Sequence, residues 1–230
     1  MKVMITVKCH EHLQERLQQA GYEVIYDPEV SYDSLLHQAP VLQGLVVSTR
    51  VPIDARLLER ATALQWIGRL GSGLELIDVA FAQQRGIRVV NSPEGNRDAV
   101  GEHALGMLLT LMHKLASSAA EVKTGHWIRD ANRGTELGGK TVGIIGYGNT
   151  GEAFAGKLAG LGVSILAHDR YRFGFGGALV KEASLEQVLR YSDVVSLHLP
   201  LTAETKHLAN EAFFAQCSRK PWFINTSRGG

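Results

Sequence analysis

Short apolar runs alternate with helix-length segments along most of this 230-residue chain. In the N-terminal part the apolar runs lie at 2–7, 22–27, 44–49, 64–70 and 87–91. Helical patterns at 11–20, 54–61 and 77–85 lie between them; a glycine follows the first and the third, and Asp54 is placed to cap the second. Apolar runs spaced by helices predict βαβ units, and therefore a parallel sheet with helices on both faces.

The pattern changes after residue 97 and then resumes. Residues 98–123 predict one long helix that is apolar nearly all round, so we expect it to be buried between two bodies. Residues 124–140, here called the strap, are polar, glycine-rich and irregular. Further apolar runs follow at 141–146, 162–169, 193–200 and 222–227. The sequence predicts an α/β fold with two doubly wound parallel-sheet domains, 1–97 and 141–230, joined by a helix and strap at 98–140.

Composition narrows the range of partners. The formal net charge is +1 without a run of like charges, which argues against nucleic acid or a membrane surface as the main partner. No stretch approaches the ~18 consecutive apolar residues that a transmembrane helix needs. Cys9 and Cys217 are too few for a disulfide framework or a zinc cluster, so we predict two reduced thiols and no metal site. These features predict a cytoplasmic protein.

Three glycines follow the apolar run at 141–146, and each has a physical role if a dinucleotide binds there. Gly146 permits a tight turn, Gly148 lets a pyrophosphate approach the backbone, and Gly151 lets the next helix pack closely on the sheet. The first amides of that helix, near Asn149 and Thr150, would face the phosphates. A glycine-rich turn between a strand and a helix satisfies the same spacing without a ligand, so the motif needs its context.

An acidic residue supplies that context, because Asp169 ends the next apolar run eighteen positions after Gly151. A carboxylate there can accept hydrogen bonds from both hydroxyls of an adenosine ribose and would repel a 2′-phosphate, which favours NAD over NADP. Two alternatives stay open. Asp169 can be a solvated residue at a strand end, and the neighbouring Arg170 can accommodate a phosphate.

With the glycine motif in the second half, the chain resembles the D-isomer-specific 2-hydroxyacid dehydrogenase family. Four stretches carry the resemblance in the family's order: 64–111, 136–170, 192–214 and the final "FINTSRGG" at 223–230. The resemblance implies a flavodoxin-like substrate domain at the N-terminus and a Rossmann NAD domain after it. In the family, the last strands of the cofactor sheet and the segment that returns to the substrate domain come after the arginine motif, so the second domain here would be incomplete.

The resemblance also implies roles for particular residues. Cofactor contacts fall on Gly146, Gly148, Asn149, Thr150, Gly151, Asp169, Leu199, Pro200, Thr226 and Ser227. Arg228 matches the catalytic arginine, whose planar fork can hold a 2-oxo acid's carboxylate and carbonyl together. Ser72, Gly73 and Asn96 fall near the substrate, although "GSG" can also be a simple turn. We interpret Glu102 and His103 as interdomain hydrogen bonders and His198 as a packing residue.

The implied function is an NAD-dependent oxidoreductase that exchanges hydride with a small D-2-hydroxy acid or 2-oxo acid. The family's proton-donating histidine and its glutamate partner lie beyond the arginine motif, so we expect residues 1–230 alone to bind NAD weakly or not at all and to turn over no substrate. A non-catalytic NAD(H)-sensing or scaffold protein on the same fold is the alternative. A homodimer that pairs through 98–123 is expected from the family, whereas burial of that helix within one chain explains its apolar surface equally well.

Overall fold

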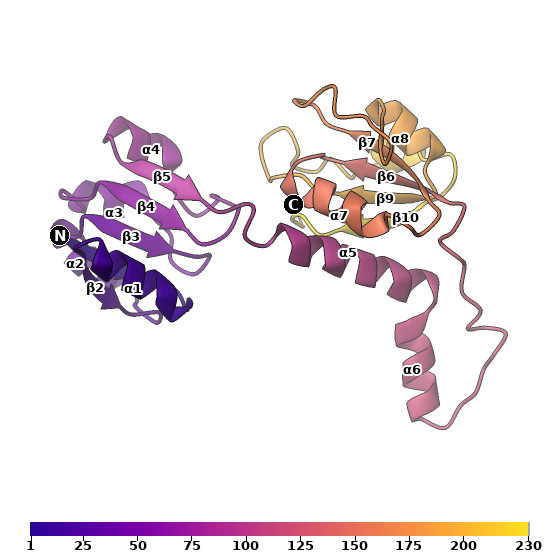
Figure 1. Cartoon of the computed structure of the whole chain (residues 1–230), viewed down its shortest axis with the longest axis horizontal. Coiled ribbons are helices and arrows are strands. Elements are labelled where there is room, and N and C mark those ends of the chain that lie inside the picture. The colour runs from indigo at the N-terminus through magenta and orange to yellow at the C-terminus, as the bar shows by residue number, and fades with distance from the viewer. Residues whose placement is uncertain (230) are drawn as a thin grey trace. The chain divides into compact units, whose positions relative to one another are not determined.

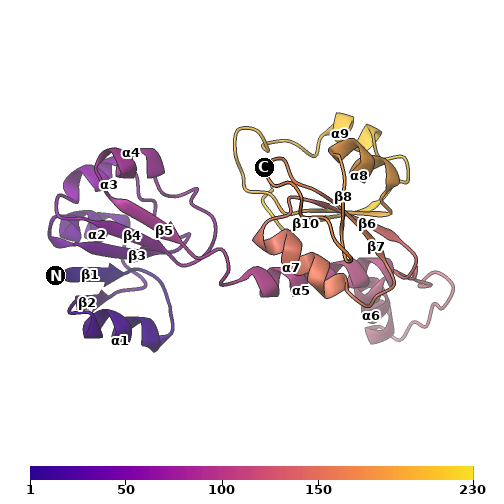
Figure 2. The same cartoon turned by 45° about the horizontal axis from the view of Figure 1, so that its top comes forward.

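The structure, a computed structural model, describes residues 1–229 and divides into two compact units, Met1–Gly95 and Asn96–Gly230. Each unit has a five-stranded, entirely parallel sheet of its own (Figures 1 and 2). The predicted α/β class with two parallel-sheet domains is therefore confirmed. Residues 96–140, the helical segment and the strap, group with the second sheet.

Unit 1 has the strand order β2-β1-β3-β4-β5, which is the flavodoxin-like order. Its strands are β1 (Lys2–Ile5), β2 (Glu23–Tyr26), β3 (Gly44–Val47), β4 (Trp66–Arg69) and β5 (Arg88–Asn91). Its helices are α1 (Glu11–Gln19), α2 (Tyr32–Gln38), α3 (Ala55–Arg60) and α4 (Val79–Gln84), with a 3-10 turn at Ala39–Val41. Asp54 caps α3 as predicted, because its carboxylate accepts a hydrogen bond from the Leu57 amide at 3.0 Å.

The two faces of this sheet have separate apolar clusters. One face packs Val3, Ile5 and Val46 against α1, through Leu13 and Leu17. The other packs the inner strands against buried residues of α2, α3 and α4 in a larger cluster. The inner strands β1 and β3 are covered on both faces and are continuous apolar runs. The burial of β4 alternates, and the edge strands β2 and β5 are partly exposed.

Unit 2 has the strand order β10-β9-β6-β7-β8. Its strands are β6 (Thr141–Ile145), β7 (Ser164–His168), β8 (Lys181–Glu182), β9 (Val194–Leu197) and β10 (Trp222–Asn225). Its helices are α5 (Arg97–Met112), α6 (Leu115–Lys123), α7 (Asn149–Leu158), α8 (Leu185–Tyr191) and α9 (Glu211–Ala215). The chain passes from β6 to β7 on one side and then returns to β9 on the other, so the order reverses beside β6. In open parallel sheets ligands bind at such a reversal, outside the carboxyl ends of the strands.

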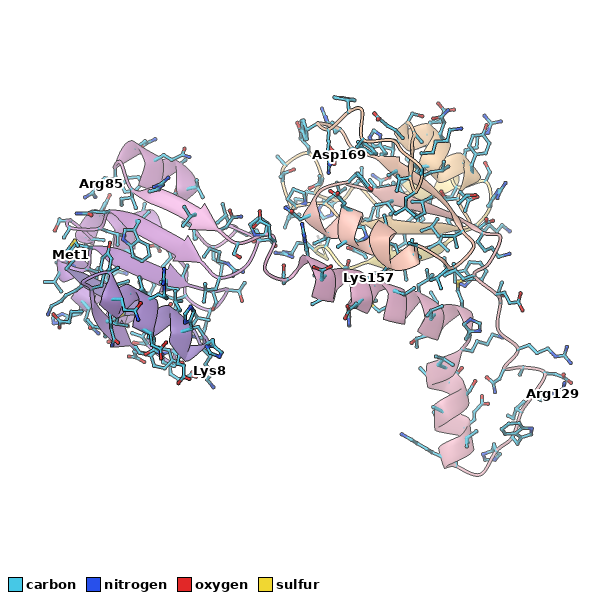
Figure 3. The ribbon with its side chains drawn as sticks, viewed as in Figure 1. Met1, Lys8, Arg85, Arg129, Lys157 and Asp169 are labelled. Atoms are coloured by element: carbon cyan, nitrogen blue, oxygen red, sulfur yellow. The ribbon has the colours of Figure 1, made fainter. Side chains whose placement is uncertain are left out.

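Helices cover both faces of the second sheet as well. On one face Leu108 of α5 and Phe154 of α7 pack against Val142 and Ile144 of β6, in one buried cluster. On the other face α8 and α9 pack against β9 in a second cluster that contains Val188 and Phe213. Lys157 of α7 also reaches Glu102 of α5, with 2.9 Å between Nζ and Oε1 (Figure 3). The helix α7 after the glycine motif therefore packs against both the sheet and α5, which lies beside it on the same face.

The prediction of one helix over 98–123 was wrong. The helix breaks at Lys114, which has a left-handed backbone with φ of 53°, and separates into α5 and α6. The break follows from the strap, because the Thr135 amide donates to the carbonyl of Met112 at 2.9 Å and the Lys114 ammonium donates to Ala131 at 2.7 Å. The predicted burial of this segment is found on one side of α5 only, and no residue of α6 is buried.

Among residues 1–229, no helix combines the length and the apolar character required to cross a bilayer.

Candidate active site

The residues predicted to bind the cofactor gather at the carboxyl edge of the unit 2 sheet. The glycine motif follows β6, Asp169 follows β7, Leu199 and Pro200 lie just beyond β9, and Thr226 begins the segment after β10. These four strands are neighbours and run parallel, so their carboxyl ends meet at one edge. Segments that are up to eighty residues apart in the chain thus meet at one edge of the sheet, at the reversal in strand order. This edge, with the glycine motif, Asp169, Leu199–Pro200 and Thr226–Arg228, is called the trough below.

A side chain would have a different effect at each of the three glycines of the motif. Gly146 has a φ of +91°, and a Cβ there would overlap the carbonyl oxygen of His198. A Cβ at Gly151 would overlap the carbonyl oxygen of Gly146, so only glycine lets α7 approach the turn. At Gly148, in contrast, a Cβ would meet nothing within 4 Å. The space beside Gly148 is therefore not filled by the protein, which fits a group such as a pyrophosphate.

The start of α7 is suited to hold an anion. Gly148 is its N-cap and has no side chain to accept hydrogen bonds from the first-turn amides of Asn149 and Thr150. The ten residues of α7 align their peptide dipoles toward this end. The amide donors, the helix dipole and the open space at Gly148 together fit the phosphates of a dinucleotide.

Asp169 binds the glycine loop itself. Its Oδ2 accepts from the Tyr147 amide at 2.8 Å, and its Oδ1 accepts from the amides of Tyr171 at 2.9 Å and Arg172 at 3.0 Å. Burial raises the pKa of this carboxyl, but the hydrogen bonds from Tyr171, Tyr147 and Arg172 outweigh it and hold the pKa below its ordinary value. A carboxylate has about four lone-pair sites, so about one stays open for a ribose hydroxyl rather than the two that we expected.

Ser227 connects the two strand ends on the other side of the trough. Its hydroxyl donates to the carbonyl of Leu197 and accepts from the amide of Leu199, both at 2.9 Å. Its own amide donates to Asn225 Oδ1 at 2.9 Å, and the Asn225 side chain donates to the carbonyl of Arg228 at 2.9 Å. Ser227 therefore positions both the Leu199–Pro200 segment and the backbone that carries Arg228.

Arg228 lies where two cavities meet. One is lined by Leu199, Pro200, Ser227 and Arg228 together with part of 201–210, and the other by Asn96, His103, Met107, Thr226 and Arg228. The Thr226 hydroxyl is buried and has no hydrogen-bond partner among residues 1–229. A buried hydroxyl without a partner suits a cavity wall against which a polar group of a ligand packs. The structure thus brings together six predicted residues of unit 2, namely Asn96, Leu199, Pro200, Thr226, Ser227 and Arg228.

Ser72 and Gly73 belong to unit 1 and follow β4 at the carboxyl edge of that sheet. The Asn91 side chain donates to the carbonyl of Ser72 at 2.7 Å, and the Ser92 amide donates to Gly71 at 3.0 Å. Gly71 has a φ of +133°, so the turn requires glycine at that position. The segment is a turn anchored to the end of β5, and its role toward a substrate stays a prediction.

Two other sequence interpretations can be compared with the structure. The Glu102 carboxylate pairs with Lys157 inside unit 2, and His103 lines the cavity beside Arg228, whereas hydrogen bonds from either residue to the other domain stay a prediction. His198 is a packing residue as predicted: it is buried, its ring stacks on Phe154 with 5.3 Å between centroids, and burial lowers its pKa to about 4.

Sequence reasoning did not identify several residues around the trough. His103 and His207 line the two cavities, Arg172 donates to the carbonyl of Tyr147 at 2.9 Å, and Glu204 pairs with Arg170 at 3.3 Å. Arg172 is the second basic residue after Asp169 and was visible in the sequence. The direction of its side chain, however, depends on the turn after β7. No cluster of His, Cys, Asp or Glu side chains able to hold a metal ion is found within residues 1–229.

The parallel sheet with its reversed strand order, the glycine turn and the acidic residue at the end of β7 define a Rossmann-type dinucleotide-binding unit. Residues 105–230 match the sequence model of the NAD binding domain of D-isomer specific 2-hydroxyacid dehydrogenases. The chain belongs to this family. The matched domain is an NAD-binding domain, and the cradle at Gly146–Gly151 fits that cofactor.

Relatives and solved structures agree with the assignment to the family. The D-3-phosphoglycerate dehydrogenase of Archaeoglobus fulgidus is 33% identical over the whole chain, and that of Rattus norvegicus is 31% identical. The chain spans only 44% and 43% of these two proteins. A D-lactate dehydrogenase from Aquifex aeolicus, solved with NAD and lactic acid, superposes with a TM-score of 0.84 at 26% identity, over the whole chain and 69% of that structure.

Proposed function

We propose that the chain is the cofactor-binding and substrate-orienting part of an NAD-dependent dehydrogenase that acts on a small D-2-hydroxy acid or its 2-oxo acid. Its relatives are named for D-3-phosphoglycerate and hydroxypyruvate, and these are the first candidate substrates. The observation that carries the proposal is the meeting of Arg228, Thr226 and Asn96 in one cavity at the carboxyl edge of a sheet that also holds the glycine cradle.

The chain's residues have distinct tasks in this proposal. The amides at the start of α7 hold the pyrophosphate, and Asp169 accepts a hydrogen bond from the adenosine ribose through its remaining acceptor site. Bound NAD supplies or accepts the hydride. Arg228 pairs its guanidinium with the substrate carboxylate, which orients the carbon that exchanges hydride.

Binding measurements test this function directly. NADH fluorescence titration should detect a complex with the 230-residue chain, and a 2-oxo acid should then bind to that complex in calorimetry. Arg228→Lys keeps the charge but loses the planar fork, so we expect about tenfold weaker 2-oxo acid binding with unchanged NADH binding. Arg190→Lys on α8 is the control. Absence of NADH binding at millimolar nucleotide contradicts the proposal.

Turnover is a separate question. Of the two outcomes expected from the sequence, weak NAD binding or none, we propose weak binding, because the glycine cradle and Asp169 are both part of this chain. We also propose that residues 1–230 alone oxidise no NADH with a 2-oxo acid, because the family's histidine and glutamate lie beyond its arginine motif. A dehydrogenase-like rate from this chain contradicts that, and its loss in His103→Gln would assign the proton to His103. Tight NADH binding with no 2-oxo acid binding would instead support the alternative of an NAD(H)-sensing protein.

We also propose that two copies of the chain pair through α6 and the strap. No residue of α6 is buried, and Leu115, Val122, Trp127 and Ile128 are large apolar side chains that are exposed. Trp127 is the extreme case, with 82% of its surface exposed. Apolar side chains gathered on one arm favour a protein partner, and a second copy satisfies them symmetrically.

A cytoplasmic location stays a prediction from the sequence, which cell fractionation tests.

A further inference from the structure

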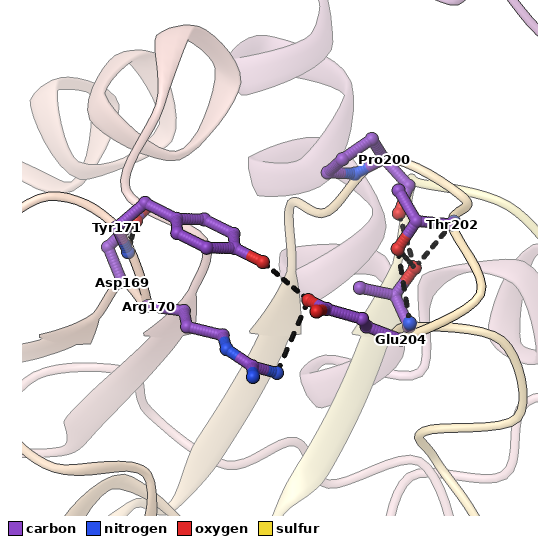
Figure 4. Close-up of polar contacts among 7 residues, drawn as sticks. Asp169, Arg170, Tyr171, Pro200, Thr202 and Glu204 are labelled. Atoms are coloured by element: carbon purple, nitrogen blue, oxygen red, sulfur yellow. Dashed lines mark hydrogen bonds and ion pairs between the residues drawn. The ribbon is translucent and has the colours of Figure 1, made fainter.

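Glu204 joins two segments that leave neighbouring parts of the sheet. Residues 169–172 follow β7 and residues 200–206 follow β9, the two strands that flank β6. The Arg170 guanidinium lies 3.3 Å from Glu204 Oε2, and the Tyr171 hydroxyl donates to the same oxygen (Figure 4). One carboxylate therefore holds both residues that come directly after Asp169.

Each side of this bridge is anchored. Glu204 lies on a turn in which the Thr205 hydroxyl donates to the carbonyl of Pro200 at 2.6 Å and accepts from the Thr202 amide at 2.9 Å. On the other side, the Tyr171 amide donates to Asp169, whose carboxylate also holds the glycine loop. The bridge is thus built from the glycine loop through Asp169 to the turn beyond Pro200.

Whether a 2′-phosphate can be bound at this end of the trough depends on the direction of the Arg170 guanidinium. An arginine near the ribose-binding carboxylate is the group that accommodates a 2′-phosphate in NADP-binding proteins. Here the carboxylate of Glu204 neutralises the Arg170 guanidinium and directs it toward the 200–206 segment (Figure 4).

We propose that Glu204 determines the choice of NAD over NADP in this protein by holding Arg170 away from the position of a 2′-phosphate. The inference rests on the proposed function, because it requires that a nicotinamide dinucleotide binds in the trough. The side chains of Arg170 and Glu204 are 66% and 49% exposed, so their pairing adds little to the stability of the fold. Its loss should change the choice of ligand and leave folding intact.

The test compares the binding of NADH and NADPH, measured by nucleotide fluorescence. In Glu204→Gln we expect the dissociation constant for NADPH to fall about fivefold, because a freed guanidinium can pair with the 2′-phosphate. NADH binding and the thermal midpoint should change little. Glu186→Gln, which removes an exposed carboxylate on α8, is the control and should leave both affinities unchanged.

A second substitution separates positioning from the simple loss of a charge. Arg170→Ala in the Glu204→Gln background should abolish the gain in NADPH affinity, whereas Arg170→Ala alone should change NADPH affinity little. An unchanged NADPH affinity in Glu204→Gln, or a gain that survives Arg170→Ala, overturns the inference while NADH binding still supports the proposed function. Wild-type chain that binds neither nucleotide overturns the proposed function, and the inference with it.

Discussion

Gly148 and Gly151 lie three positions apart, and their missing side chains serve different purposes. A Cβ at Gly151 would overlap backbone, whereas a Cβ at Gly148 would enter open space beside the start of α7. Gly148 also has an ordinary negative φ of −90°. The first glycine of the pair thus leaves open space beside the start of the helix, and the second allows the helix to pack.

Gly148→Ala should leave the protein folded but weaken NADH binding about tenfold, because the new methyl group occupies the space beside the pyrophosphate. Fluorescence titration gives the affinity and differential scanning calorimetry the thermal midpoint. Gly156→Ala is a matched control in the same helix, since its Cβ also meets nothing within 4 Å. Equal NADH affinities for the two variants would contradict this role of Gly148.

His198 couples the stability of unit 2 to pH. Its pKa of about 4 in the folded protein lies below the ordinary value of 6.5, because the ring is buried. The unfolded chain therefore takes up the proton more readily, and stability is lost as pH falls through the window from 6.5 to 4. Lowering the pH from 7.5 to 5 should cost about 2 kcal/mol from this group alone.

Urea unfolding of unit 2 at both pH values checks this expectation, with His198→Gln compared against the wild type. Glutamine keeps a partner for the Ser196 hydroxyl, which lies 2.9 Å from the His198 ring nitrogen. The variant should lose less stability than the wild type on acidification. The exposed His126→Gln should behave like the wild type, and an equal loss in all three proteins would show that burial of His198 does not matter.

At the scale of elements, the contact between α5 and α7 depends on a small residue. Gly101 of α5 is buried, and a Cβ there would lie 3.0 Å from the backbone carbon of Ala153 and 3.1 Å from the amide of Phe154. Gly106, one and a half turns later, has nothing within 4 Å of its Cβ position. The close approach is therefore local to the first half of α5, beside the middle of α7.

Gly101→Val should push α7 outward and destabilise unit 2 by about 1–3 kcal/mol, because overpacking a buried contact forces backbone shifts. Gly106→Ala should instead stabilise it by up to about 1 kcal/mol through helix propensity. The free energies of unfolding of both variants and of the wild type, measured in urea, test these two expectations. A Gly101→Val variant as stable as the wild type would mean that α5 packs on α7 less tightly than the structure shows.

At the scale of the whole molecule, the exposed apolar arm formed by α6 and the strap predicts association. Light scattering after size exclusion should give about twice the 25.1 kDa mass of the chain. Trp127→Ala with Leu115→Ser should shift the protein toward monomer and leave NADH binding intact, since both residues lie outside the trough. Phe173→Ser, a similarly exposed aromatic elsewhere, is the control. A monomeric wild type contradicts the proposal.

Much of the fold and part of the site could be predicted because their causes are local. The apolar runs, the cap at Asp54, the glycine turn and the carboxylate after β7 each depend on a few consecutive residues. The break at Lys114 could not be predicted, because the strap residues that hold it come twenty positions later. The two-residue strand β8 was also missed, since Lys181–Glu182 has no apolar pattern and pairs only through β7.

The sequence by itself determined the class of fold and the identity of the residues at the carboxyl edge, because periodicity and turn chemistry operate over short distances along the chain. Only the tertiary structure decided what those residues do there. Asp169 accepts one hydrogen bond from the glycine loop and two from the turn after β7, Ser227 joins two strand ends, and Glu204 pairs with Arg170. Apart from the two in the turn after β7, these contacts join residues from 22 to 34 positions apart, and hydrogen bonds over such separations exist only once the strands have paired.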